Sequence, residues 1–99
     1  MNRKQIIRAN QIKTELSLHS DTRIHTNCIR IHPTESFKHF IAKCKDCFEA
    51  KRNHQMFLTE AWTADRKRRF DFVNLDTGEV REYETNPKVV KRDAVSFYI

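Results

Sequence analysis

The chain has 99 residues, of which 38% are hydrophobic and 32% are charged, and its formal net charge is +6. This length fits one domain with a modest core, and the apolar content is too high for a wholly disordered chain. No apolar run approaches the roughly 20 residues that span a bilayer, and the first residues lack the apolar core of a signal peptide. The odd count of three cysteines is typical of a reducing compartment. We therefore expect a soluble, cytoplasmic protein without a membrane partner.

The first 33 residues are predicted to form an N-terminal extension of the domain. Residues 1–19 favour a helix, because Ile6, Ile12 and Leu16 fall loosely on one helical face. The stretch HSDT then interrupts this pattern. The β-branched, partly alternating residues that follow predict a strand over 22–32.

Residues 35–52 have the clearest periodicity in the chain. Pro33 ends the preceding strand, and Thr34 is a suitable N-cap for a helix. The apolar residues then recur at helical spacing, at Phe37, Phe40, Ile41, Cys44 and Phe48. The pattern predicts a long amphipathic helix whose apolar stripe packs on a sheet.

The remaining residues predict three strands and a final helix. The strands are expected at 55–62, 69–75 and 79–85, with a basic loop over 63–68 between the first two. Pro87 suits the first turn of a terminal helix, and Val90, Ala94 and Phe97 follow at helical spacing. We therefore expect an α+β fold in which a small, mostly antiparallel sheet packs against the 35–52 helix. Residues 34–99 would form its helix-strand-strand-strand-helix core.

Acidic residues gather on the predicted hairpin, and the register of its strands decides where they point. A four-residue loop over 75–78 pairs Asp71 with Glu82, whereas a two-residue turn at 77–78 pairs Asp71 with Glu84. An odd, bulged loop would point the acids apart, onto solvated surface. We expect an even loop, which gathers the carboxylates into a hard-oxygen site suited to Mg²⁺ or Mn²⁺.

Either even register also predicts that Val73 and Val80 are buried under the 35–52 helix. The alternative for the acids is that they solvate an exposed strand and pair with Arg81 or Arg69.

The stretch TEAWTADRKRRFDFVNLDTGEVREYETN carries an Asp, ten intervening residues, a Glu, one residue and a second Glu. In this layout, over about residues 34–99, the chain resembles the PD-(D/E)XK nuclease superfamily. That superfamily has a restriction-endonuclease-like core of a helix, three antiparallel strands, a helix and a last strand. The resemblance implies that Asp71 is the metal-binding acid and that Glu82 is the carboxylate that follows it. Glu84 would stand where the family has its motif lysine.

The same resemblance implies a further metal ligand from Glu35 or Glu60. It also implies that Glu84, Lys88 or Lys91 orients the attacking water or stabilises the transition state. The chain ends where the family's last strand would begin, so we expect a truncated core with an open sheet edge. An open edge favours homodimerisation.

Basic residues flank the acidic hairpin on both sides. The nucleic-acid-binding residues are predicted to be Arg66, Lys67, Arg68, Arg69, Lys91 and Arg92. The preferred function is therefore that of a DNA-binding, magnesium-dependent nuclease that hydrolyses phosphodiester bonds. The alternative is a non-enzymatic nucleic-acid-binding protein, or a dimeric assembly protein, on a degenerate nuclease-like scaffold.

The cysteines offer a second metal hypothesis. Cys28, His32, Cys44 and Cys47 include the CKDC spacing that zinc prefers. Since Cys44 falls on the predicted apolar stripe and Cys47 lies at its margin, we interpret both as core residues and expect no zinc.

Overall fold

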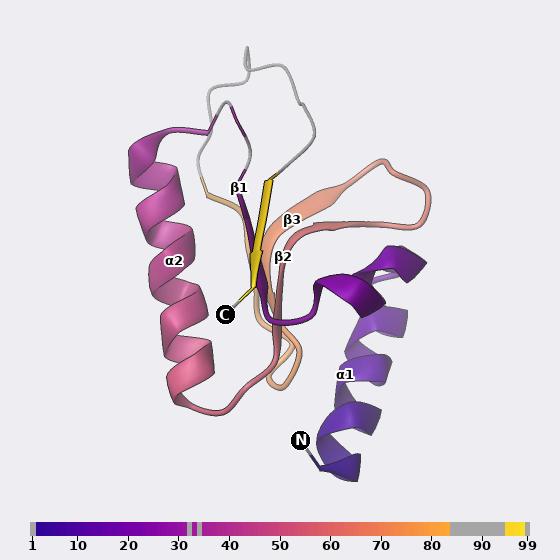
Figure 1. Cartoon of the computed structure of the whole chain (residues 1–99). Helices are drawn as coiled ribbons and strands as arrows, with labels where there is room; N and C mark the ends of the chain where they lie inside the picture. Colours follow the sequence, from indigo (N-terminus) through magenta and orange to yellow (C-terminus); the bar gives the residue numbers. More distant parts are fainter. Residues whose placement is uncertain (1, 32, 34, 84–94, 99) are drawn as a thin grey trace.

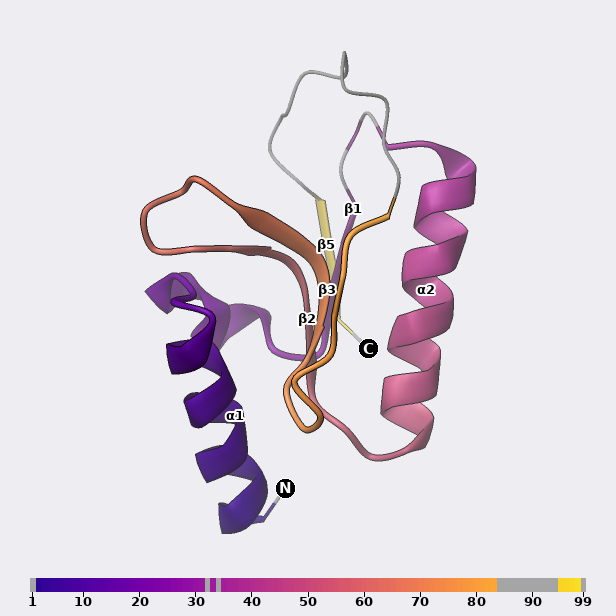
Figure 2. The same cartoon turned by 180° about the vertical axis from the view of Figure 1, so that it is seen from behind.

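Two α-helices lie on opposite sides of a small set of antiparallel strands (Figures 1 and 2). The computed structural model describes residues 2–31, 33, 35–83 and 95–98. Its elements are α1 (Arg3–Glu15), a 3₁₀ helix η1 (Ser20–His25), β1 (Cys28–Ile31), α2 (Phe37–Arg52), β2 (Phe57–Trp62), β3 (Arg69–Asn74), β4 (Val80–Arg81) and β5 (Val95–Tyr98). The predicted α+β class is confirmed.

The strands form two antiparallel groups that hydrogen bonds of Thr59 and Asn27 join. β2, β3 and β4 make a three-stranded sheet in chain order, and β1 pairs with β5. The Thr59 hydroxyl on β2 donates to the Cys28 carbonyl at 2.7 Å and accepts from the Arg30 N–H at 2.8 Å. The Asn27 N–H also donates to the Phe57 carbonyl at 2.8 Å. β1 is thereby held beside β2 without a regular ladder.

Both ends of the chain differ from their prediction. The expected strand over 22–32 begins as η1, and of its described residues Cys28–Ile31 are strand. At the other end Val95–Tyr98 are a strand rather than the end of a helix, and Cys28 pairs with Tyr98. The β-branched and aromatic residues of VSFY favour a strand, and β1 offers them an edge to pair with. The expectation of a missing last strand is therefore wrong. The rest of the predicted terminal helix lies outside the described residues.

α1 is part of the core rather than an appended helix. Its N-cap, Asn2, accepts a hydrogen bond from the Gln5 N–H at 2.8 Å. Ala9 and Ile12 are buried in one cluster with residues of β2 and β3, namely Leu58, Ala61, Phe70 and Val73. α1 thus supplies one of the two layers that cover the strands.

α2 begins at Phe37 after the N-cap Ser36, whose hydroxyl accepts from the His39 N–H at 3.1 Å, so the predicted cap at Thr34 is wrong. The helix faces the strands with a different stripe from the one expected. His39, Lys43, Cys47 and Ala50 are buried. Phe37 and Phe48 of the predicted stripe are 78% and 62% exposed.

The hairpin has the even register that the sequence predicts. Phe72 pairs with Arg81 and Val73 with Val80, which places Glu82 next in line opposite Asp71. The Asn74 carboxamide oxygen accepts from the Asp76 and Thr77 N–H groups, and Gly78 follows with φ of 82°. The burial prediction is wrong in detail, because Val73 packs in the α1 cluster and Val80 is exposed.

Candidate functional site

Side chains along β2 and β3 do not alternate strictly between the two faces of the sheet. The alternation shifts by one residue near Glu60 on β2 and near Asp71 on β3. Leu58 and Ala61 share the α1 cluster although they are three residues apart, and so do Phe70 and Val73. Glu60 lies within the first shift and has φ of 51°, a conformation that L-residues rarely adopt. Because of these shifts, the Glu60 and Asp71 side chains both turn to the α2 side, where they meet Lys43 and His39. Strained backbone at buried polar residues is a feature of functional sites.

Lys43 is the centre of the resulting polar cluster. Its side chain has no exposed surface, and its ammonium binds Glu60 Oε1 at 2.9 Å and Glu35 Oε1 at 3.0 Å. The third donor binds the Arg30 carbonyl at 2.7 Å. All three ammonium protons therefore have a hydrogen-bond acceptor. Through these bonds Lys43 links α2 to β1, to β2 and to the segment before α2.

Arg69 bridges the two strand acids. Its Nε lies 3.0 Å from Glu60 Oε2, and one terminal nitrogen lies 3.3 Å from Asp71 Oδ1. The Arg69 side chain is only 14% exposed. Its guanidinium therefore supplies a positive charge between two buried carboxylates.

His39 completes the cluster. Its Nε2 lies 3.4 Å from Glu35 Oε2 and 3.7 Å from Asp71 Oδ1, at ion-pair rather than good hydrogen-bond geometry. Its ring meets the Tyr83 ring edge-on, and the Tyr83 hydroxyl donates to the Asp46 carboxylate. His39 therefore places a ring nitrogen beside two buried carboxylates.

Asp71 is the carboxylate that burial perturbs most clearly. Burial raises its pKa, and Glu60 adds to the rise. The Tyr83 N–H, which donates to Asp71 Oδ2 at 2.9 Å, opposes it, as do Arg69 and His39. Asp71 is therefore held near positive groups but is short of solvent, a combination that is common at catalytic acids.

The cluster carries three carboxylates, Glu35, Glu60 and Asp71, against two permanent cations. With His39 neutral it has an excess of one negative charge. This excess of negative charge attracts a cation to the position of the cluster.

The predicted second ligand lies outside this cluster. The Glu82 carboxylate is about half exposed and pairs with Arg68 at 3.4 Å. The next residue, Tyr83, is the one that reaches Asp71. The even register therefore does not by itself bring Asp71 and Glu82 together. Glu84, Lys88, Lys91 and Arg92 lie outside the described residues.

The basic residues divide between the surface and the cluster. Asp65 shapes the predicted loop, because its carboxylate accepts from the Thr63 hydroxyl and the Lys67 N–H, which lowers its pKa. Arg66, Lys67 and Arg68 are exposed on this loop. Arg69 faces inward, so its predicted contact with nucleic acid does not fit its position.

Sequence reasoning named Asp71, Glu60 and Glu35 but missed Lys43, His39 and the inward role of Arg69. A signal was present, because His39, Lys43, Cys47 and Ala50 also recur at helical spacing. That stripe is mostly polar, so the apolar stripe beside it dominated the prediction.

The cysteines belong to the interior or its margin. Cys28 and Cys47 are fully buried, and Cys44 is half-buried. Burial raises the pKa of the Cys47 thiol, which keeps it protonated near neutral pH. His32 lies outside the described residues.

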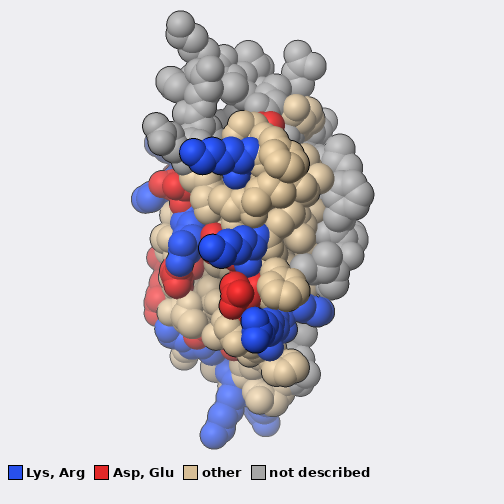
Figure 3. Space-filling model, turned by 90° about the vertical axis from the view of Figure 1, so that its left-hand side faces the viewer, with Lys and Arg blue, Asp and Glu red and all other residues tan. Residues whose placement is uncertain are grey.

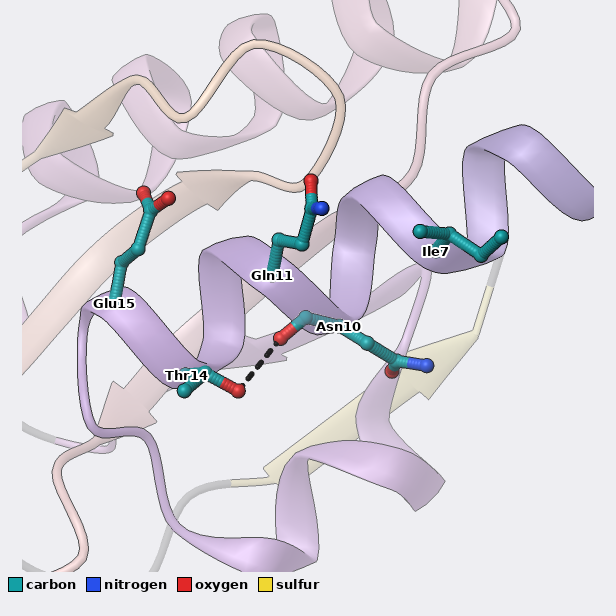
Figure 4. A pocket seen from close by; sticks show the side chains of 5 residues that line it. All are labelled: Ile7, Asn10, Gln11, Thr14 and Glu15. Atoms are coloured by element: carbon teal, nitrogen blue, oxygen red, sulfur yellow. Dashed lines mark hydrogen bonds between the residues drawn. The ribbon is translucent and has the colours of Figure 1, made fainter.

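A shallow hollow occurs on the outer side of α1, away from the cluster (Figure 4). Its lining residues are all exposed: Ile7, Asn10, Gln11, Thr14 and Glu15. Because it has no buried charged group, the Lys43 cluster is the stronger candidate site.

Comparison with known proteins gives no relative, since no family model, curated protein or solved structure matches the chain significantly. Within the described ranges, no group of three or more His, Cys, Asp or Glu side chains is arranged to hold a metal ion, and no helix is long and apolar enough to cross a membrane.

Proposed function

We propose that this protein binds DNA and hydrolyses its phosphodiester bonds with a divalent metal ion, as a member of the PD-(D/E)XK superfamily. The observation that supports this most directly is the convergence of Glu35, Glu60 and Asp71 from three segments of the chain. Burying three carboxylates together is unfavourable for folding, so function is a good reason for their presence.

Glu60 and Asp71 are the proposed metal ligands, with Glu35, Glu82 or Glu84 as further candidates. Their oxygens are the donors that Mg²⁺ and Mn²⁺ prefer. The Arg69 guanidinium lies between the Glu60 and Asp71 carboxylates. This contact supports the proposal that the space between the two carboxylates favours a positive group. A bound metal ion would lower the pKa of a water molecule and offset charge on the phosphate.

The chain's own groups would prepare the site for this reaction. Lys43 fixes the Glu60 and Glu35 carboxylates, which limits their motion when a ligand arrives. His39 offers a proton acceptor beside Asp71. The exposed bases Arg66 and Lys67 would bind phosphates on DNA.

The test is a plasmid-nicking assay with and without Mg²⁺ or Mn²⁺. Wild-type protein should nick the plasmid only with metal, and Asp71→Ala should lower the rate at least about 100-fold. Glu79→Gln removes an exposed acid from the same hairpin and should leave the rate unchanged. Equal nicking by wild type and Asp71→Ala would contradict the proposal.

Thermal unfolding gives a second readout that does not depend on turnover. Mg²⁺ or Mn²⁺ should raise the unfolding temperature of the wild type by mass action, and Asp71→Asn should abolish that rise. If the metal ions stabilise both proteins equally, Asp71 is not a ligand.

A non-enzymatic DNA-binding protein is the second candidate. The observation that favours it is that Lys43 and Arg69 already pair with all three carboxylates without a metal ion. Salt-sensitive DNA binding without metal-dependent nicking would support this function instead.

A further inference from the structure

The outer face of α2 is apolar and is not covered by the described residues. Phe37, Phe48 and Ile41 are 78%, 62% and 47% exposed, and Phe40 and Cys44 are half-buried beside them. Figure 3 looks onto this side of the molecule and shows uncharged surface with Lys and Arg side chains alongside it. We name Phe37, Ile41, Cys44 and Phe48 the outer stripe.

The size of the exposed surface indicates an interface. A phenylalanine buries about 150–250 Å² when it is fully covered, so the two exposed rings alone offer on the order of 200–300 Å². With Ile41, the outer stripe reaches the size of the largest apolar patch on a typical monomer, roughly 300–600 Å².

The spacing of the outer stripe fits another helix. Its residues follow one another at steps of four, three and four, which is the pattern of core positions in a coiled coil. A helix that packs on α2 would therefore meet one apolar residue in every turn. Sheets and loops have no such period.

The charges beside the outer stripe select the partner. Lys38, Lys45 and Arg52 are exposed and recur every seven residues, so they form one basic edge along the stripe. The acids of the helix, Asp46 and Glu49, lie beyond that edge. The opposite edge carries Phe40 and the buried Cys47, and the exposed Lys51 follows Phe48 at the C-terminal end of the outer stripe, so no acid lies on this side.

This arrangement disfavours pairing with a second copy of the chain. A second α2 would offer the basic edge either the same bases or an uncharged edge, and like charges along a seam oppose pairing. We infer that the outer stripe is a docking surface for an amphipathic helix with an acidic edge from a partner protein. The inference does not depend on the nuclease proposal, because it uses no residue of the Lys43 cluster.

The experiment measures binding of a labelled synthetic peptide to the full chain. The peptide has three heptads with Leu at the core positions and Glu at the flanking positions, and a matched peptide carries Lys in place of Glu. Fluorescence anisotropy should show saturable binding of the acidic peptide and binding at least tenfold weaker for the basic one.

Two variants locate the contact. Phe37→Ser with Phe48→Ser should abolish peptide binding, and Lys38→Gln with Lys45→Gln and Arg52→Gln should weaken it about tenfold. Circular dichroism and thermal melts check that each variant is folded. Ile7→Ser, on the far helix, is the control for loss of an exposed apolar side chain and should bind like the wild type.

Three results would overturn the inference. The first is equal binding of both peptides, or binding of neither. The second is a wild-type dimer in light scattering that becomes monomeric in the Phe37→Ser, Phe48→Ser variant, because the partner is then a second copy. The third is that the same variant loses binding to anionic vesicles or to DNA that the wild type binds, because the outer stripe then recognises lipid or nucleic acid.

Discussion

Lys43 is a buried lysine whose ammonium is surrounded by polar partners. Its ammonium has no contact with solvent and is balanced by Glu35, Glu60 and the Arg30 carbonyl. A buried ammonium without such partners would be strongly unfavourable, and so would the carboxylates without the ammonium. The stability of the cluster is therefore a property of the set and not of any one pair.

Replacing Lys43 by methionine tests this dependence. The variant keeps the aliphatic volume but leaves Glu35 and Glu60 buried without the ammonium, and we expect a loss of about 3–5 kcal/mol in the free energy of unfolding. Urea titration measures the loss. Lys45→Met on the exposed side of α2 is the matched control and should change stability by less than about 0.5 kcal/mol. Similar values for both variants would mean that the cluster contributes no stability.

Asp71 gives a prediction about pH. Because burial raises its pKa in the folded state, the charged form opposes folding at pH 7 and the protonated form does not. Asp71→Asn removes this charge, keeps an acceptor for the Tyr83 N–H and leaves Arg69 paired with Glu60. The variant should be more stable than wild type at pH 7, on the order of 1 kcal/mol.

The difference should shrink as the pH falls through the acidic range, since wild-type Asp71 then becomes protonated in the folded protein. Thermal melts of both proteins between pH 7 and about pH 4 provide the comparison. A variant that is less stable than wild type at pH 7 would show that Arg69 and the Tyr83 N–H more than compensate the burial.

At the scale of single elements, the sequence predicted where most helices and strands lie, but it did not predict which face of α2 packs on the strands. The periodicity over 35–52 located α2, and the expected even loop of the hairpin is confirmed, with the Asn74 carboxamide oxygen accepting from the Asp76 and Thr77 N–H groups in the turn. Periodicity gave the wrong face of α2, because its polar stripe faces Glu60 and Asp71 across the interface. A pattern of apolar residues carries no information about buried ion pairs.

The candidate site was predictable only in part for a related reason. Asp71 was named from its place on the hairpin, and Glu35 and Glu60 were named only through the resemblance to the nuclease superfamily. Strict alternation put Asp71 on the same face as Val73. The break in that alternation on β2 includes Glu60, whose φ is positive. The sequence does not indicate a positive φ at this position, because the residues that commonly adopt one are Gly and Asn.

The loop between β2 and β3 carries a prediction of its own. Arg66, Lys67 and Arg68 are exposed on a turn that Thr63 and Asp65 hold in shape. Changing all three bases to Gln should weaken DNA binding at every sequence and flatten its dependence on salt. Filter binding at several salt concentrations measures both effects.

The control for this prediction is a variant that loses the same number of positive charges on α2 instead of on the loop. The Lys38, Lys45 and Arg52 triple Gln variant removes three bases from α2, and its affinity for DNA should fall much less. If the loop variant binds DNA as the wild type does, the contact with phosphate lies elsewhere or DNA is not the partner.

On the scale of the whole molecule, the strands separate two different interiors. The α1 side is apolar, with Ile12, Leu58 and Val73 fully or almost fully buried. The α2 side combines a small apolar cluster around Phe57 and Phe72 with the Lys43 cluster. The first interior provides most of the hydrophobic stabilisation, which allows the second to hold charges that function would require.

The pairing of β1 with β5 has a consequence for how the protein is made. β1 (Cys28–Ile31) and its partner β5 (Val95–Tyr98) lie far apart in the sequence, with α2, β2, β3 and β4 between them. Domains generally fold as units during synthesis, and contacts between distant segments form late. α1, α2 and the β2–β3 hairpin can assemble before β5 is synthesised, but β1 has no ladder until β5 emerges from the ribosome. During synthesis β1 is therefore an open strand, and pairing with β5 closes it.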